Sequence, residues 1–482
     1  MRTALLSLAA FVLGLAGTAH VCAQPAYDLE AQRAKLWDFF ADKHTEIGDD
    51  YKKVQLFEDA LQQYLRAIEL MPDHGKARRG LGMKKKGDAW VDDEPMPEKS
   101  PLKPSEKVEA RKKPDELKAK NFEKCADRAR KQVQAATSAG DPRAARILAS
   151  DVLTYAPDDA AARKLRGHEK LGEDWMPGFA KKWREAGMAH VAKGTFGEEV
   201  TEEDEQAKEI SVKFTRRSSK WLMARTTYDD TRAKFMHRNG EAAITRAMEL
   251  LGVEAPFGAH RYTITHFQSV AEYDAMLEKV LKLTGDELAF AKKLAGHGQS
   301  KPWGFLCRSN SDAGADDMIA NTIAINVMNT NRRNGRLTQP WVETGFSYLI
   351  TSQTLGTCIT TRYSLIKQGA TASSHTTMPE LNKKSGTPDH LREAILREVT
   401  FKRDLPLSRI VNYETNDMTM EAAAKSFSLM EFWFSNYPDA TRKYLASPGE
   451  EKEARLTNVE THFGKKVEEI EAEWREWVLA NY

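Results

Sequence analysis

The chain has 482 residues, and its 72 Lys and Arg residues nearly balance its 70 Asp and Glu residues. This length predicts roughly three domains. A net charge of +2 argues against a nucleic-acid-binding protein, because such proteins carry a clustered excess of basic residues.

The N-terminus has the three parts of a secretory signal peptide, which we place at residues 1–23. Arg2 gives a basic start, an uncharged and largely apolar run follows, and small residues precede a polar one. Val21 and Ala23 lie three and one residues before the expected cleavage site at Gln24. We therefore expect an exported protein, located in the periplasm or outside the cell.

Two other interpretations of the N-terminus are weaker. An uncleaved anchor would have to span the membrane with residues 3–19, a run that is short for a span and rich in Ala and Gly. A lipid anchor on Cys22 would need a different sequence before the cysteine than Ala19-His20-Val21. No other apolar run approaches the length of a span, so we expect a soluble mature chain.

The first half of the mature chain contains an internal repeat. Residues 60–72 carry small and apolar side chains spaced for one helix face and end in a proline, and they resemble the second helix of a tetratricopeptide repeat. The pattern returns 85 residues later, at residues 145–157. Identical residues at this offset include Pro72 and Pro157, Ala77 and Ala162, Gly82 and Gly167, Gly87 and Gly172, and Trp90 and Trp175. The offset indicates a duplication, with one helical unit at 24–91 and a second at 122–205.

Each unit is expected to be a helical hairpin whose apolar face needs a neighbour. Two copies are fewer than the three or more that such arrays usually need. The repeats therefore favour a helical spacer that packs on the C-terminal domain. A protein-binding groove is the alternative.

Residues 92–121, between the two copies, are rich in Pro, Lys and Glu and poor in apolar residues. Such a segment buries too little surface to order itself. We therefore predict a solvated, charged linker, with a helix only at its end.

From about residue 210 the patterns of strands and helices alternate. Expected strands cover residues 221–227, 261–267 and 304–307, and expected helices cover residues 230–251 and 270–295. Strands followed mostly by helices are typical of an α+β domain with a small sheet. The predicted fold class of the chain is therefore α+β, with a helical N-terminal half.

A further pair of helices is expected in this domain. Residues 316–328 begin with two acids and continue as an apolar run, which predicts a buried helix. After a polar loop, residues 340–349 read Pro-Trp-Val-Glu-Thr-Gly-Phe-Ser-Tyr-Leu. With an aromatic helix at 413–438 and a closing helix at 462–477, this order resembles the peptidase-MA-like gluzincin family, especially its secreted bacterial members with tetratricopeptide-like repeats. The resemblance covers roughly residues 215–482 and implies a gluzincin-like domain at 210–482.

In that family two histidines at i and i+4 of one helix, and a glutamate on the next helix, bind zinc, and a glutamate beside the first histidine is the general base. The resemblance aligns Asn321 with the first histidine and Thr322 with the general base. It aligns Ile325 with the second histidine and Thr344 with the third ligand. Between Ile325 and Thr344 lie 18 residues, the spacing of thermolysin-like members.

None of these four side chains suits the chemistry. Isoleucine has no donor atom, asparagine and threonine are poor neutral ligands for zinc, and threonine is no base near neutral pH. We therefore predict a degenerate zinc site, with no catalytic residue, no metal and no cofactor.

Glu343 lies one residue before the third ligand position, and a shift of one residue turns a helical side chain by about 100°. We expect Glu343 in the first turn of its helix, where the helix dipole stabilises an acid. The same explanation applies to Asp316 and Asp317. The alternative is that Glu343 reaches a functional cleft.

Three cysteines remain after cleavage, Cys125, Cys307 and Cys358. An exported compartment permits disulfides, and Cys307 with Cys358 is the only pair that we consider. Two buried thiols are the alternative.

The sequence favours an exported, non-catalytic protein whose degenerate peptidase-like domain binds an extended peptide or an envelope protein, or serves as a structural module. One alternative is a hydrolase with a relocated site, although Gly-x-Ser-x-Gly, a P-loop and a spaced acid–base pair are all missing from the sequence. The other alternative is a scaffold that acts through its helical repeats.

Overall fold

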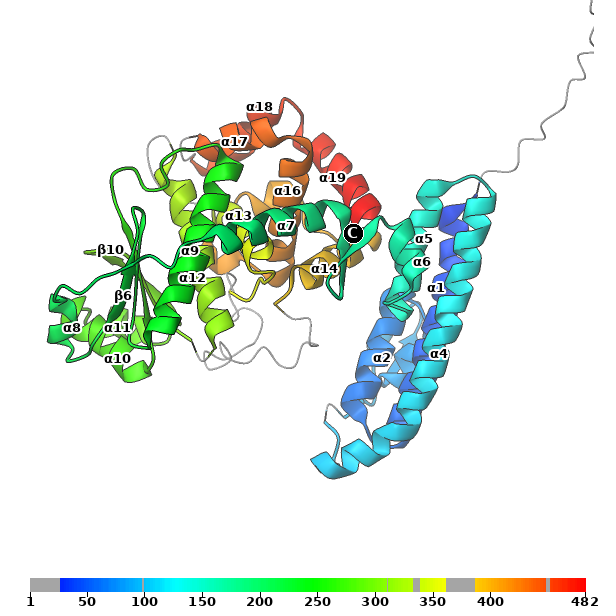
Figure 1. Cartoon of the computed structure of the whole chain (residues 1–482). Helices are drawn as coiled ribbons and strands as arrows, with labels where there is room; N and C mark the ends of the chain where they lie inside the picture. Colours follow the sequence, from blue (N-terminus) through cyan, green and yellow to red (C-terminus); the bar gives the residue numbers. More distant parts are fainter. Residues whose placement is uncertain (1–26, 98, 310, 333–338, 361–385, 448–450) are drawn as a thin grey trace, which may run out of the picture. The chain divides into compact units, whose positions relative to one another are not determined.

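The computed structural model describes residues 27–97, 99–309, 311–332, 339–360, 386–447 and 451–482. The predicted signal peptide lies outside these residues. The chain is 64% helical and has a small mixed sheet, which confirms the predicted α+β class with helices predominating. Clustering of contacts divides the chain between Ala162 and Arg163 into two compact units, which we describe separately (Figure 1).

The first unit is built almost entirely of helices. Its elements are α1 (Leu29–Lys53), α2 (Phe57–Leu70), α3 (Gly75–Gly80), the hairpin β1 (Met83–Lys86) and β2 (Ala89–Asp92), α4 (Pro104–Ser138) and α5 (Pro142–Tyr155). α6 (Ala160–Leu165) crosses the boundary between the two units, and β3 (His168–Leu171) and β4 (Asp174–Pro177) belong to the second.

The duplication recurs in the bounds of these elements. At an offset of 85 residues α2 corresponds to α5, α3 to α6, β1 to β3 and β2 to β4, and each of these pairs agrees in its first and last residue. α1 and α4 also end 85 residues apart, at Lys53 and Ser138. Each copy is therefore two long helices, a short helix and a hairpin. The second copy corresponds to residues of α4, α5, α6, β3 and β4, whereas the second unit was predicted at 122–205.

The predicted linker is largely helical, because α4 covers its residues from Pro104 onward. Lys107 Nζ lies 2.8 Å from Glu58 Oε1, and Arg111 Nη2 lies 2.8 Å from Asp59 Oδ2. Both acids lie in the first turn of α2. The charged residues that suggested a solvated segment thus form ion pairs with the preceding helix pair, and the prediction of a linker over 104–121 is wrong.

The second unit contains a six-stranded sheet in the order β5-β6-β7-β8-β10-β9. The strands are β5 (Glu198–Glu199), β6 (Thr215–Ser218), β7 (Leu222–Thr226), β8 (Tyr262–Phe267), β9 (Gly296–Ser300) and β10 (Trp303–Arg308). β7, β8 and β10 are parallel, whereas β6 and β9 pair antiparallel with their neighbours. The three predicted strands are confirmed as β7, β8 and β10.

The segment before the edge strand β9 was expected to form a single long helix. The chain instead forms α10 (Val270–Ala275), the π-helical turn η1 (Met276–Val280) and α11 (Gly285–Ala291) before β9. Lys282 interrupts the helical run with a left-handed backbone (φ 55°). The prediction of one helix over 270–295 is therefore wrong.

Helices cover both faces of the sheet (Figure 1). α9 (Asp230–Leu251) and α12 (Asp312–Thr330) pack against β7, β8 and β10 on one face, where Ile264 and Cys307 are fully buried. On the other face Phe267 and Leu306 pack with residues of α8 (Glu205–Glu209), α10, η1 and α11. Alternate residues of each strand thus face two separate apolar clusters.

The remaining helices pack around the same apolar cluster as α9 and α12, further from the sheet. They are α7 (Gly178–Lys193), α13 (Pro340–Thr354), α14 (Pro388–Thr400), α15 (Leu407–Ile410), α16 (Met420–Asn436), α17 (Pro438–Ala446), α18 (Arg455–Phe463) and α19 (Val467–Asn481), with the short turns η4 (Thr415–Asp417) and η5 (Lys452–Ala454). Trp341, Trp433 and Trp474 are fully buried at its centre. The predicted helices at 230–251, 316–328 and 340–349 are confirmed as α9, α12 and α13.

Candidate functional site

The four positions that the resemblance aligns with a zinc site lie on the neighbouring helices α12 and α13. Asn321 Nδ2 donates to Ser347 Oγ at 2.9 Å, and Asn329 Nδ2 donates to Glu343 Oε1 at 3.1 Å. Residue numbers rise along α12 as they fall along α13 between these two contacts, so the helices run antiparallel in this region.

This register brings the aligned positions together. Ile325 is midway between Asn321 and Asn329 on α12, so it lies opposite the turn of α13 that carries Thr344. Ser347 Oγ also donates to the carbonyl of Thr344, at 3.2 Å. The hydroxyl of Ser347 therefore connects Asn321, which is aligned with the first histidine, to Thr344, which is aligned with the third ligand.

The four side chains are all buried. Asn321 and Thr344 are 0% and 1% exposed, and Ile325 and Thr322 are 5% and 7% exposed. Thr322 Oγ1 is buried and has no hydrogen-bond partner among the described residues. A buried hydroxyl without a partner costs about 1–3 kcal/mol.

Gly345, beside Thr344, has a packing role. A Cβ at this position would lie 2.4 Å from the carbonyl oxygen of Ser426, on α16. No side chain fits at that distance, so the glycine allows α13 to pack closely on α16.

Glu343 lies in the first turn of α13, as predicted, and is partly buried. Its Oε1 accepts the hydrogen bond from Asn329, so this acid joins the two helices at their polar end.

The dipole explanation is wrong for Asp316 and Asp317, because α12 begins at Asp312 and both acids lie beyond its first turn. Asp316 Oδ1 lies 2.7 Å from Nη2 of Arg232, and its Oδ2 accepts from Asn239. Asp317 is fully buried and accepts four hydrogen bonds. The donors are Thr357 Oγ1 (2.6 Å), the Ile359 amide (3.0 Å), the Thr360 amide (2.8 Å) and Thr360 Oγ1 (2.5 Å). Asp317 therefore connects α12 to the segment after α13 through hydrogen bonds.

Cys125, Cys307 and Cys358 are free, buried thiols, so of the two alternatives for Cys307 and Cys358 the structure has the buried thiols and not the disulfide. Burial raises the pKa of Cys307 and of Cys125 to about 12. Burial also raises the pKa of Cys358. Thiols in this state are poor nucleophiles.

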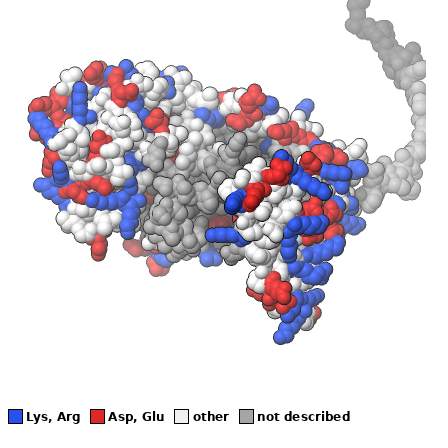
Figure 2. Space-filling model, turned by 90° about the horizontal axis from the view of Figure 1, so that it is seen from below, with Lys and Arg blue, Asp and Glu red and all other residues white. Residues whose placement is uncertain are grey.

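A search of the described residues finds no group of three or more His, Cys, Asp and Glu side chains that could hold a metal ion. Within the same part of the chain, no helix combines the length and the apolar character that a membrane span requires. On the face in Figure 2, Lys and Arg side chains are interspersed with Asp and Glu, in keeping with the small net charge.

β9 forms one edge of the sheet, beyond β10. It reads Gly296-His297-Gly298-Gln299-Ser300, and Gly298 and Ser300 are exposed. Edge strands are usually protected by lysine, proline or a bulge, and the five residues of β9 contain no lysine or proline. These residues carry no strand signal, because two glycines and three polar residues have low strand propensity.

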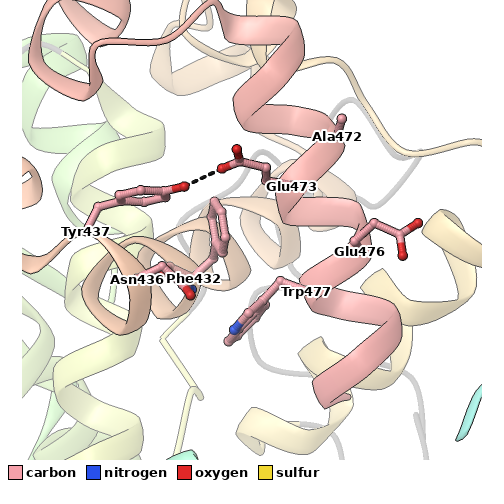
Figure 3. A pocket seen from close by; sticks show the side chains of 7 residues that line it. All are labelled: Phe432, Asn436, Tyr437, Ala472, Glu473, Glu476 and Trp477. Atoms are coloured by element: carbon pink, nitrogen blue, oxygen red, sulfur yellow. Dashed lines mark hydrogen bonds between the residues drawn. The ribbon is translucent and has the colours of Figure 1, made fainter. Parts of the chain in front are cut away.

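A pocket of about 450 Å³ lies between α16 and α19 (Figure 3). It is lined by Phe432, Asn436, Tyr437, Ala472, Glu473, Glu476 and Trp477. The hydroxyl of Tyr437 donates to Glu473, and Lys465 Nζ lies 2.6 Å from Glu473 Oε1. Lys465 lowers the pKa of Glu473, so this carboxylate is already neutralised by a partner of its own. The pocket therefore offers an aromatic wall but little free charge for catalysis.

A second pocket, of about 490 Å³, lies at the end of the sheet where β9 ends and β10 begins. Its residues come from the α9–β8 loop, from β9 and β10, and from the end of α12. The sequence patterns indicated neither pocket, since both combine segments that are distant along the chain.

Comparison of the chain with protein-family models, with curated proteins and with solved structures finds no match.

Proposed function

We propose that the chain is an exported, non-catalytic protein whose residues 210–482 form a peptidase-like scaffold, and that this scaffold binds an extended peptide segment along β9. The observation that carries the non-catalytic part is the packing of α12 against α13. The positions that would hold zinc are occupied by neutral side chains at the contact between these helices.

Asn321 illustrates the argument. Its amide is buried and donates to Ser347, so the group that would replace a histidine is engaged in joining two helices. Ile325 has no atom that can bind a metal, and Thr344 offers only a buried hydroxyl. These residues support a retained framework better than a site with unusual ligands.

The binding part of the proposal is supported by the free edge of β9. A strand at a sheet edge presents amide and carbonyl groups that can pair with an extended peptide. β9 carries no proline or lysine to prevent this pairing, and Gly298 leaves the space above its Cα open. A peptide of several residues would extend the sheet beyond β9.

Two measurements test the proposal. The first is the zinc content of the purified full-length protein, determined by elemental analysis; stoichiometric zinc would refute the non-catalytic part. The second is selection from a displayed peptide library, followed by binding of the selected peptides to proline variants of β9.

Successive amides of a strand point to opposite sides, so His297→Pro and Gly298→Pro remove one amide from the free edge and one from the ladder with β10. The variant that loses an amide from the ladder with β10 serves as the control. Its lower thermal stability identifies it. We expect the other variant to keep its stability and to bind selected peptides at least about tenfold more weakly, because main-chain hydrogen bonds supply the affinity in this binding mode. Unchanged binding by that variant would remove β9 from the proposal.

A scaffold that acts through the helical repeats is a second candidate, favoured by the recurrence of the element bounds at one offset. In the first copy Trp90 of β2 is only partly buried and lies beside Arg78 (5.7 Å from the ring centroid). A partner captured by the full chain and lost with Trp90→Ser, but not with the β9 variants, would favour this candidate.

A further inference from the structure

The pocket beside β9 and β10 combines an aromatic wall with a charged rim. It is lined by Phe257, His260, Arg261, Ser300, Trp303 and Thr330. Arg261 immediately precedes β8, Trp303 begins β10 and Ser300 ends β9. The pocket therefore lies at the amino end of the parallel strands, on the side where the last residue of α12 contributes Thr330.

The aromatic wall is held in place by its own contacts. The Trp303 ring meets Phe257 and Tyr262 edge-on, with centroid distances of 5.4 and 4.9 Å. Phe257 stacks on Tyr262 at 5.2 Å, and the hydroxyl of Tyr262 accepts from Asn326 at 3.0 Å. Trp303 is only partly buried, so its ring surface is available to a flat apolar group at no cost of rearrangement.

The rim supplies positive charge. Arg261 is exposed, and among the described residues no carboxylate, carbonyl or aromatic ring pairs with it. His260 and Ser300, which are also exposed, add a ring nitrogen and a hydroxyl. A guanidinium without a partner in a pocket favours a carboxylate, which it binds through two parallel hydrogen bonds.

Two features could instead favour a cation, namely the aromatic rings and the C-terminal end of α12. Three carbonyls near the end of α12, those of Asn326, Val327 and Met328, however, already accept hydrogen bonds. Thr330 Oγ1 donates to the carbonyl of Asn326 at 2.7 Å, and Asn331 Nδ2 donates to that of Val327 at 2.8 Å. The full charge of Arg261 then outweighs what remains of the partial charge at the helix end, so the pocket selects an anion.

We propose that this pocket binds an aryl carboxylate, with the aromatic group against Trp303, which the buried Phe257 supports from behind, and the carboxylate on Arg261. Two sources share this chemistry, a free aromatic acid and the C-terminal aromatic residue of a peptide. The site does not require peptide pairing with β9, although Ser300 places it at the end of that strand.

The test is calorimetric titration of the full-length protein with N-acetyl-L-tryptophan and with N-acetyl-L-tryptophanamide, which lacks only the negative charge. We expect the amide to bind at least about tenfold more weakly, as the loss of a charge-assisted hydrogen-bond pair predicts. Acetate at the same concentration should not displace N-acetyl-L-tryptophan, because it cannot use the aromatic wall.

Arg261→Gln should bring the affinity for N-acetyl-L-tryptophan down to that for the amide. Lys301→Gln is the matched control, because it removes an exposed charge next to Ser300 from a residue that does not line the pocket. This control should bind as the unaltered protein does. Equal binding of the acid and the amide, or unchanged binding by Arg261→Gln, would overturn the proposal.

An acetylated tetrapeptide that ends in tryptophan with a free carboxylate distinguishes the two sources. Tighter binding than that of N-acetyl-L-tryptophan identifies the end of a peptide chain as the ligand. Equal or weaker binding identifies a free aromatic acid.

Discussion

Asp317 connects α12 to the segment after α13, and its replacement should show how much that connection contributes to stability. Its Oδ1 accepts from the amide and the hydroxyl of Thr360, and its Oδ2 accepts from Thr357 and from the amide of Ile359. In Asp317→Asn one of these oxygens becomes an NH₂ group, which cannot accept. One backbone amide is then left facing another donor in a fully buried site, while the threonine hydroxyl that shared the same oxygen can turn to accept.

The expected loss follows from the energy of such contacts. A hydrogen bond to a charged group contributes about 1.5–3 kcal/mol, and losses within one network are not additive. We therefore expect Asp317→Asn to lower the free energy of unfolding by about 3 kcal/mol, close to the effect of Asp317→Ala. Urea denaturation followed by tryptophan fluorescence measures this change. Hydrogen exchange at the amides of Ile359 and Thr360 should become faster.

Asp312→Asn provides the matched control on the same helix, because the side chain of Asp312 is 71% exposed. We expect this variant to lose less than about 1 kcal/mol. If Asp317→Asn and Asp312→Asn lower stability equally, or if the exchange of the Ile359 and Thr360 amides is unchanged, the assigned role of Asp317 is wrong.

Three further predictions concern buried polar groups. Thr322→Val should raise the free energy of unfolding by about 1 kcal/mol, because it removes a buried hydroxyl without a partner; destabilisation in urea would contradict this. Burial, and then the nearby Arg232, lower the pKa of His266 from 6.5 to about 4, so the unfolded chain takes up a proton between these pH values before the folded chain does. Stability should therefore fall by about 3 kcal/mol as the pH falls from 6.5 to 4, and His266→Gln should flatten urea midpoints measured across this range; an equal fall in the variant would contradict the assignment. Lys425 is fully buried between Asp404 (3.1 Å) and Glu471 (2.6 Å), so Lys425→Met should cost about 3–5 kcal/mol in the same assay, whereas a neutral effect would show that these acids find other partners.

The sequence predicted best where local patterns decide the structure. The expected helix at 230–251 has the observed bounds of α9, and its acidic start and Gly252 (φ 69°) at its end are local signals. The strands at 221–227 and 261–267 were found from their apolar and β-branched residues, and the duplication from one constant offset.

Prediction failed where a segment is ordered by its contacts with another element and not by a pattern of its own. β9 has no strand signal of its own, and a Cβ at Gly296 would lie 2.2 Å from the ring of Phe305, on the neighbouring strand. The glycine is thus required by the sheet, and only the pairing with β10 reveals it. The first turns of α4 were predicted to be a linker because they are polar. They are helical because two of their charges pair with Glu58 and Asp59, on another helix.

The candidate site was predicted in part. The helix at 316–328 was predicted from its acidic start and apolar run, and it and the helix that begins at Pro340 are observed as α12 and α13. The role of Asp317 was missed, since its four donors lie about 40 residues further along the chain. The pocket around Arg261 was missed for the same reason, because its residues come from four separate segments.

The position of the second repeat limits where this protein can be shortened. The boundary between the two compact units falls inside α6, so the helices α4 and α5 belong to one unit and the hairpin β3–β4 to the other. In the second unit Arg166 donates to the backbone carbonyl of Leu479 at 2.7 Å, and His168 is buried. A deletion that removes the whole second repeat would therefore also take away residues on which the C-terminal helix packs. A shortened chain meant to isolate the second unit should begin no later than Arg163.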